Sequence, residues 1–224
     1  MLALHRVRTS GNFSVEKLVT TLNTDFDRVS MHGVRKDLLQ QQAESLGIPL
    51  HIIPLQGDVS MDSYNAIMRE HTSGLKDEGF EVAVFGDIFL EDLMGYRKKQ
   101  LKEIGLEGIF PLWKESTESL VKEFLDLGYK ASVVCVNANL LDKSFCGRPF
   151  DQDFLADLPQ NVDPCGENGE FHTFVFDGPL FKKPIDFEIG EKVFRDFSPN
   201  KKEEDDCFKE PQTWDTKFWF AELQ

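Results

Sequence analysis

The chain lacks any apolar run long enough to cross a membrane, and the apolar part of its start, MLALHRVR, is too short for a signal peptide. It is also poor in basic residues: 25 Lys and Arg stand against 39 Asp and Glu, a formal net charge of −14. Such a charge repels phosphate backbones and anionic lipid. We therefore expect no nucleic-acid partner, no membrane association and a cytoplasmic protein.

Cysteine is scarce as well. The four cysteines form no CxxC pair and show no zinc-ribbon spacing. A chain of 224 residues that is 41% hydrophobic can build a large core without disulfide bonds. Reduced thiols are therefore predicted, and the apolar run SVVCV predicts core packing for the first of them. The cysteines are Cys135, Cys146, Cys165 and Cys207.

The first half of the chain alternates between strand-like and helix-like patterns. Apolar, β-branched runs predict strands, and apolar residues at helical spacing predict the helices between them. Because single helices connect successive strands, the strands should run parallel with helices on both faces. The predicted fold class is α/β with a doubly wound parallel sheet. The strands are expected at 17–24, 50–55, 82–85, 108–113 and 131–137, and the helices at 34–47, 61–75, 91–104 and 117–127.

From residue 161 onward the pattern changes to short aromatic segments separated by proline, glycine and charge, which is typical of a small antiparallel sheet. This change predicts an α/β domain over 1–113 and a smaller C-terminal α+β domain over 114–224. The aromatic cluster at 214–220 is expected to pack on the core or on a second subunit, and the latter would form a homodimer. Strands are expected at 171–176, 186–190, 192–197 and 217–223, with a polar connection over 198–213.

Polar residues crowd into NTDFDRVSMHGVR, residues 23–35, which follows one predicted strand and opens a predicted helix. In a parallel sheet this is the carboxyl edge of the strand, where ligands bind. The hypothesis is that Asn23, Thr24, Ser30 and His32 contact a nucleotide. The alternative is a solvated loop whose Asp and Ser side chains only form turns and helix caps.

A second polar segment, FGDIFLEDL, spans residues 85–93 and follows the apolar strand VAVF. Acidic side chains at the carboxyl end of a strand can hold a Mg²⁺ ion that bridges nucleotide phosphates. Asp87 is the predicted metal residue, and Gly86 is predicted to lie against the nucleotide. Glu91 and Asp92 have the alternative role of complementing a helix N-terminus.

The third polar segment is VDPCGENGEFHTFV, residues 162–175. Its glycines let the backbone approach a ligand, while Glu167, Glu170 and His172 can supply acid, base or hydrogen-bond partners in catalysis. A hairpin turn at the Asn-Gly pair is the alternative, but it leaves the neighbouring polar residues unexplained. We expect these three candidates to line one cleft with residues of the other two segments, namely Asn23 and Asp87.

Together, NTDFDRVSMHGVR, FGDIFLEDL, the FPLW of 110–113 and DPCGENGEFHTFV resemble the diphthine–ammonia ligase family, also called N-type ATP pyrophosphatases. This family belongs to the adenine-nucleotide α-hydrolase superfamily. The resemblance implies an enzyme that uses ATP and Mg²⁺ to adenylate a substrate carboxylate with release of pyrophosphate. Ammonia then gives the amide and AMP. In the family's named reaction the carboxylate is diphthine, a modified histidine of translation elongation factor 2.

The resemblance also implies roles for individual residues. Residues 23–35 would line the adenosine side of a nucleotide-binding domain, 1–113, and Asp87 would lie near phosphate and metal. Residues 165–173 would build the acyl or ammonia side of the cleft in a substrate domain, 114–224. The substrate residues implied are Cys165, Gly166, Asn168 and Thr173.

One motif of the family is missing from these 224 residues. The family begins with a strand and a glycine-rich loop of the type SGGKDS, whose backbone amides cradle the phosphates. MLALHRV resembles the helix that follows that loop. Since the missing strand is central in the family's sheet, a gap is expected between the strands at 18–22 and 82–85. We expect the natural chain to continue upstream; the alternative is a damaged, inactive version of the enzyme. In either case the 224 residues alone should release pyrophosphate too slowly for a useful rate.

Two alternatives stay open. The first keeps the chemistry but changes the substrate to a small carboxylate metabolite. The second is a non-catalytic nucleotide-binding or assembly protein that retains the adenosine side and the C-terminal aromatic sheet. The in-frame sequence upstream of Met1 is the observation that would discriminate best between an enzyme and a non-catalytic protein.

Overall fold

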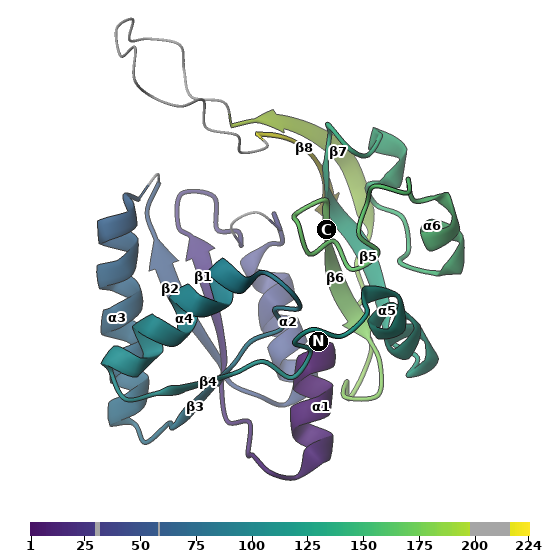
Figure 1. The fold of residues 1–224 in the computed structure, drawn as a ribbon. Coiled ribbons are helices and arrows are strands. Elements are labelled where there is room, and N and C mark those ends of the chain that lie inside the picture. Colours follow the sequence, from purple (N-terminus) through teal and green to yellow (C-terminus); the bar gives the residue numbers. More distant parts are fainter. Residues whose placement is uncertain (30–31, 58, 198–215) are drawn as a thin grey trace, which may run out of the picture.

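The computed structural model describes residues 1–29, 32–57, 59–197 and 216–224, and these form a mixed α/β fold (Figure 1). The first half contains α1 (Leu2–Ser10), β1 (Leu18–Asn23), α2 (Lys36–Leu46), β2 (Leu50–Leu55), α3 (Met61–Asp77), β3 (Val82–Val84), α4 (Glu91–Glu103) and β4 (Glu107–Ile109). The second half contains α5 (Thr117–Asp126), β5 (Lys130–Asn137), the short 3₁₀ helix η1 (Lys143–Phe145), α6 (Gln152–Asp157), β6 (Phe171–Asp177), β7 (Ile189–Asp196) and β8 (Lys217–Leu223).

The strands of the first half run parallel, but they form two sheets rather than the single doubly wound sheet that the sequence predicts. β1 pairs with β2, and β3 pairs with β4. In the described chain β1 and β3 are not hydrogen-bonded to each other, which is where the sequence places a gap. Alternating strands and helices predict direction, because a crossover makes strands parallel. The break between the two sheets lies at the gap expected between the strands at 18–22 and 82–85, whereas one doubly wound sheet is not formed by the described residues.

The second half forms one antiparallel sheet in the order β6-β5-β8-β7. β5 lies inside this sheet, and seven of its eight residues are buried, as its apolar run requires. The two strands predicted at 186–190 and 192–197 are one strand, β7, whose pairing register shifts between Ile189 and Lys192. β8 is also an inner strand, so its aromatic residues Phe218 and Phe220 pack against Cys135 in the core. Trp214 and the predicted polar connection lie outside the described residues.

The main core surrounds β5 and contains apolar residues from both halves of the chain. On one face, a cluster of phenylalanines packs under α6, with Phe154 fully buried. On the other face, Val34 and Leu38 at the start of α2 pack against Val134 of β5 and Phe174 of β6. Figure 1 accordingly shows α2 between the β1–β2 sheet and the antiparallel sheet. Helix α2 therefore joins the two halves through apolar contact.

The cysteines that the structure describes are free thiols, as the sequence predicts. Cys135 and Cys146 are buried in the core, and burial raises the pKa of the Cys146 thiol to about 11. A thiol with such a pKa stays protonated at neutral pH and is a poor nucleophile. These two residues therefore act as small apolar core side chains. Cys207 lies outside the described residues.

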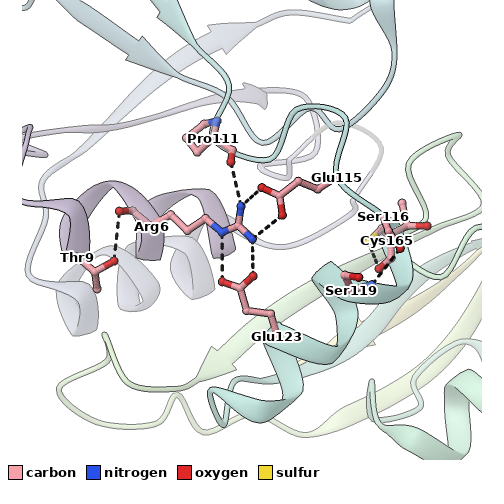
Figure 2. A network of polar contacts seen from close by, with 9 residues as sticks. Arg6, Thr9, Pro111, Glu115, Ser116, Ser119, Glu123 and Cys165 are labelled. Carbon is pink, nitrogen blue, oxygen red and sulfur yellow. Dashed lines mark hydrogen bonds and ion pairs between the residues drawn. The ribbon is translucent and has the colours of Figure 1, made fainter.

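Arg6 of α1 forms a second connection between the halves (Figure 2). Its Nε donates to Glu123 Oε1 at 3.2 Å, and Nη1 donates to the Pro111 carbonyl at 3.1 Å. Nη2 donates to Glu115 Oε2 at 2.9 Å and also pairs with Glu123. Hydrogen bonds to Glu115 and Glu123 raise the pKa of Arg6. One guanidinium thus ties α1 to α5 and to the segment that enters it.

Replacing Arg6 should weaken this connection measurably. We expect Arg6→Ala to lower the free energy of unfolding by about 2 kcal/mol, because hydrogen bonds between charged groups contribute about 1.5–3 kcal/mol when partly buried. The control is Arg69→Ala, which removes an exposed pair with Glu103 and should cost less than about 1 kcal/mol. Urea unfolding of both variants measures the difference. Equal losses would show that the Arg6 network contributes no more than a surface pair.

Candidate active site

Asp87 lies where β3 ends and before α4 begins, and its carboxylate faces Arg97 of α4. Arg97 Nε is 3.1 Å from Asp87 Oδ2, and the Asp87 side chain is only 11% exposed. The guanidinium carbon of Arg97 also lies 4.6 Å from the ring centroid of Phe85. Burial raises the pKa of Asp87, and the charge of Arg97 opposes that shift. The pair is therefore a partly buried ion pair set at the end of a parallel strand.

Glu167 reaches this strand end from the third polar segment, although 79 residues of chain separate it from its partner there. Its Oε1 accepts a hydrogen bond from the Ile88 backbone N–H at 2.6 Å. Burial raises the pKa of Glu167, and the nearby charge of Asp87 raises it further. The fold thus brings two carboxylates from different halves of the chain into electrostatic contact. A raised pKa makes the Glu167 carboxylate a stronger base than a solvated glutamate.

The first turn of α1 packs beside the same strand end. Leu2 and Ala3 share an apolar cluster with Ile88, and Cys165 packs against that cluster. Gly86 has open space around it, because a methyl group placed there would meet only Ala3, at 4.0 Å. Packing alone therefore does not require glycine at this position. A helix start leaves backbone N–H groups unpaired within the helix, and they favour a negatively charged ligand.

Glu170 has a different environment from Glu167. Its side chain is buried, with 2% of the residue exposed, and its Oε1 accepts from the Asp163 N–H at 3.0 Å. Asn168 donates to the same carboxylate twice, through its backbone N–H and its side-chain amide, each at 2.9 Å. All three donors belong to the 162–170 turn. The geometry therefore gives Glu170 a structural task in shaping the turn, and a catalytic role for it stays a prediction.

Gly166 and Cys165 are also held by the turn itself. Gly166 has φ of 69°, and a Cβ there would lie 2.6 Å from the Phe171 carbonyl oxygen, so only glycine fits. The Cys165 thiol donates to the Thr117 carbonyl at 3.4 Å, close to the start of α5 (Figure 2). Burial raises the pKa of Cys165 to about 12. This thiol is protonated at neutral pH, so its contacts support packing rather than nucleophilic chemistry.

His172 meets His32, so the first and third polar segments also come together. The two ring centroids are 4.3 Å apart and the rings are tilted by 37°. Burial, with a smaller effect of His32, lowers the pKa of His172 to about 3. His172 is therefore neutral at physiological pH. Thr173 is the next residue of β6, so its side chain leaves the opposite face of the strand.

The side chains of Asn23 and Thr24 form hydrogen bonds with nearby backbone groups. Asn23 Oδ1 accepts from the Asp25 N–H at 2.9 Å, and the Thr24 hydroxyl donates to the Leu55 carbonyl at 3.2 Å. Gly33 of the same segment approaches β8 so closely that a Cβ would lie 2.7 Å from Phe220. Part of this segment's glycine and Asx pattern therefore reflects packing and turns. Ser30 lies outside the described residues.

A cavity of about 580 Å³ opens on the outer side of this first segment. It is lined by residues of the 26–41 stretch, whereas Asp87 and Glu167 meet at the end of β3. The three polar segments thus meet pairwise: the second with the third at Asp87, and the first with the third at His172. From the sequence alone, Arg97 on the helix after Asp87 could reach a phosphate, but a solvated arginine is the favoured interpretation. The residues that line the cavity beside the first polar segment are Phe26, Asp27, Arg28, Arg35, Lys36, Asp37, Gln40 and Gln41.

Comparison with known proteins agrees with the motif resemblance. The family model for the diphthamide synthase N-terminal domain matches residues 1–108, and that for the C-terminal domain matches residues 116–200. The human diphthine–ammonia ligase is 35% identical over 189 residues, which cover 75% of this chain and 69% of the human protein. The chain belongs to the diphthine–ammonia ligase family. It is therefore a member of a family of ligase enzymes.

Other diphthine–ammonia ligases match to different extents. The rat protein is 33% identical over 186 residues, covering 75% of this chain and 69% of the rat protein. The protein from Schizosaccharomyces pombe is 28% identical over 183 residues, covering 72% of this chain but only 29% of its own length. No helix among the residues described here is long and apolar enough to cross a membrane.

The diphthine–ammonia ligase family implies ATP, and with it a Mg²⁺ ion. The question is whether the chain supplies suitable ligands for that ion. The described chain contains no group of three or more His, Cys, Asp or Glu side chains able to hold a metal. Magnesium in nucleotide sites needs only one or two carboxylates, because phosphates and water supply the other ligands. Asp87 fits this requirement, since its buried Oδ2 makes no hydrogen bond within the described part of the chain and only pairs with Arg97.

Proposed function

We propose that the chain is an ATP-dependent amide-forming ligase that acts on diphthine of translation elongation factor 2. The observation that carries the proposal is the hydrogen bond of Glu167 to the Ile88 N–H, next to Asp87 at the end of β3 and beside the start of α1, in a chain of this family. A strand end, a helix start and two carboxylates are the parts that a Mg²⁺-nucleotide site uses. ATP, ammonia and a carboxylate are the proposed substrates.

The proposed reaction has two steps. A substrate carboxylate oxygen attacks the α-phosphorus of ATP, the bond to pyrophosphate breaks, and an acyl-adenylate forms. The nitrogen of ammonia then attacks the acyl carbon, the bond from that carbon to the AMP oxygen breaks, and one proton leaves the nitrogen. A Mg²⁺ ion would offset the phosphate charge, with Asp87 as its protein ligand.

The proton released from the nitrogen needs an acceptor. His172, with a pKa of about 3, is too weak a base for this step at neutral pH. Glu167 suits it better, because burial and Asp87 raise the pKa of its carboxyl. We therefore propose Glu167 as the proton acceptor and His172 as a neutral group that orients the substrate. Asn23, Thr24, His32 and Gly86 are proposed to line the nucleotide, and the 165–173 segment the acyl group.

The test compares two classes of substrate. Elongation factor 2 carrying diphthine and a panel of small carboxylates are each incubated with ATP, Mg²⁺ and ¹⁵N-ammonium. Pyrophosphate release and ¹⁵N in an amide product are measured for this chain and for a chain with a strand and an SGGKDS-type loop fused ahead of Met1. Amide formation only on the protein supports diphthine, and formation only on a small acid moves the substrate to a metabolite. Absence of ATP binding would overturn the proposed enzyme.

We further propose that the chain forms a homodimer through β7, which ends the antiparallel sheet. Phe197 donates its N–H to Thr216 beside β8, so alternation directs the backbone groups of Lys192 and Phe194 away from β8. If two copies of β7 pair antiparallel about Val193, these outward groups can bond across the interface. Phe194 is 44% exposed, which leaves an apolar side chain at this edge.

The charges of Glu191 and Arg195 favour a second copy of the chain as the partner of the β7 edge. Antiparallel pairing about Val193 places Glu191 of each copy opposite Arg195 of the other, and opposite charges stabilise such cross-strand pairs. We expect Glu191→Arg or Arg195→Glu alone to raise the dissociation constant of the dimer at least about tenfold. The double exchange should restore the wild-type dissociation constant. Sedimentation equilibrium measures the three variants. A monomeric wild-type chain, or a double variant that stays dissociated, would contradict this pairing.

A further inference from the structure

Arg97 and Asp87 are close to each other without satisfying each other. Arg97 Nε and Asp87 Oδ2 are 3.1 Å apart as an ion pair, but both atoms are buried and, among the described residues, neither makes a well-aligned hydrogen bond. Buried polar atoms in proteins are nearly always hydrogen-bonded, and exceptions concentrate at functional sites. Arg97 Nε could therefore donate a better-aligned hydrogen bond to another acceptor, and Asp87 Oδ2 could bind another donor or a cation.

The surroundings of Arg97 hold its guanidinium in a defined plane. Its carbon lies 4.6 Å from the Phe85 ring centroid, and Phe85 stacks on Phe110 with centroids 5.3 Å apart and an interplanar angle of 21°. The arginine side chain is 33% exposed, so part of it can reach a ligand. A planar, oriented guanidinium presents its N–H groups as a fork that matches two phosphate oxygens.

Charge explains why such a cation is needed at this position. Asp87 and Glu167 are both acidic and lie in electrostatic contact, so a triphosphate near them meets repulsion. Asp87 cannot hold a cation for the phosphates and stay fully paired with Arg97 at the same time. A simple exchange resolves this conflict: the arginine turns to the phosphate as the carboxylate is taken up by the nucleotide's cation.

We propose that Arg97 is a phosphate ligand for the pyrophosphate part of ATP, with Asp87 as its resting partner in the free protein. This inference rests on the proposed nucleotide function and adds a residue to it. Binding breaks the Arg97–Asp87 contact and forms a bidentate contact between the guanidinium and phosphate oxygens. The exchange leaves the Asp87 carboxylate free for Mg²⁺.

Calorimetry with pyrophosphate, ATP and adenosine tests the assignment on the 224-residue chain. Arg97→Gln should weaken pyrophosphate and ATP binding by about 10- to 100-fold, since a hydrogen-bonded charge contact of this kind contributes roughly that factor. Adenosine binding should stay unchanged. Arg97→Lys keeps the charge but not the fork, so it should recover only part of the loss. Thermal unfolding of each variant checks that the fold is retained.

Arg148→Gln is the matched control. Arg148 also pairs with an aspartate, Asp157, at 2.9 Å and lies over a phenylalanine ring, Phe145, at 5.4 Å. Its replacement removes the same kinds of contact at a position between η1 and α6. We expect Arg148→Gln to bind all three ligands as the wild-type chain does.

A double-mutant cycle with Asp87 separates ligand binding from a merely structural ion pair. Without divalent cations, Asp87→Asn should strengthen pyrophosphate binding several-fold, because it both releases Arg97 and removes a negative charge, and the part of the gain that depends on Arg97 should be lost in Asp87→Asn/Arg97→Gln. Equal pyrophosphate affinity of Arg97→Gln and wild type would overturn the assignment, as would an equal gain from Asp87→Asn with and without Arg97. A wild-type chain that binds adenosine but not pyrophosphate also overturns it while leaving nucleotide binding intact. Failure to bind any of the three ligands would instead sink the proposed function.

Discussion

A strand and an SGGKDS-type loop fused ahead of Met1 are expected to raise ATP-dependent pyrophosphate release by at least about 100-fold over the 224-residue chain. The charge that develops on the transferring phosphates needs preorganised N–H donors, and removing a single donor of this kind commonly costs about 10²–10³ in rate. The structure gives such a loop a place to end, because the first turn of α1 packs against Ile88, next to Asp87.

The same fusion should also raise stability. β1 and β3 each pair on one side only among the residues described, so a parallel strand between them would join the two small sheets. Backbone hydrogen bonds along both edges would replace bonds to water and bury apolar side chains. A higher unfolding midpoint together with the gain in pyrophosphate release is therefore expected.

The controls for this experiment keep the strand and alter only the loop. A fusion with the loop's lysine and serines changed to alanine should keep the gain in stability and lose most of the gain in rate. Pyrophosphate is measured with ATP, ammonium and a carboxylate acceptor. Equal and robust activity from the 224-residue chain would show that the phosphates are held elsewhere, and the site at Asp87 would then be wrong.

The helices and strands were largely predictable from the sequence, because they depend on local apolar spacing. α3 begins at Met61 and β2 spans Leu50–Leu55, as the periodicity predicts. α6 was missed because six residues are too few for a helical period, although Asp151 caps its first turn by accepting from the Phe154 N–H. The gap between β1 and β3 was expected from the missing family strand, whereas the single doubly wound sheet expected from strand–helix alternation is not formed by the described residues.

The candidate site was predictable to the extent that strand ends determine it. Asp87 follows β3, and its role at a ligand stays a prediction, while Glu167 reaches the same strand end through the Ile88 N–H, as the polarity of its segment led us to expect. The functions of Glu167 and Glu170 could not be separated in this way, because both are acids of one glycine-rich turn. Their difference arises from direction: one side chain reaches Ile88 and the other turns into its own loop.

Replacing Glu170 should therefore cost stability before it costs chemistry. Glu170→Ala removes the buried acceptor of three hydrogen bonds and leaves the Asp163 and Asn168 N–H groups without it in a partly buried turn. Unsatisfied buried donors cost about 1–3 kcal/mol each, so we expect the free energy of unfolding to fall by about 3 kcal/mol. Urea unfolding measures this loss.

Glu167→Gln is the matched comparison from the same turn. Glutamine keeps an oxygen that can accept from the Ile88 N–H, so this variant should unfold within about 1 kcal/mol of wild type. In the loop-bearing chain it should nevertheless lower amide formation by about 10²–10⁴, the range typical of a lost general base. Glu170→Ala is thus expected to change the free energy of unfolding, and Glu167→Gln the rate of amide formation. A Glu170→Ala chain that is as stable as wild type but inactive would reverse the assignment, because it would place the chemistry on Glu170 and leave Glu167 with the structural task.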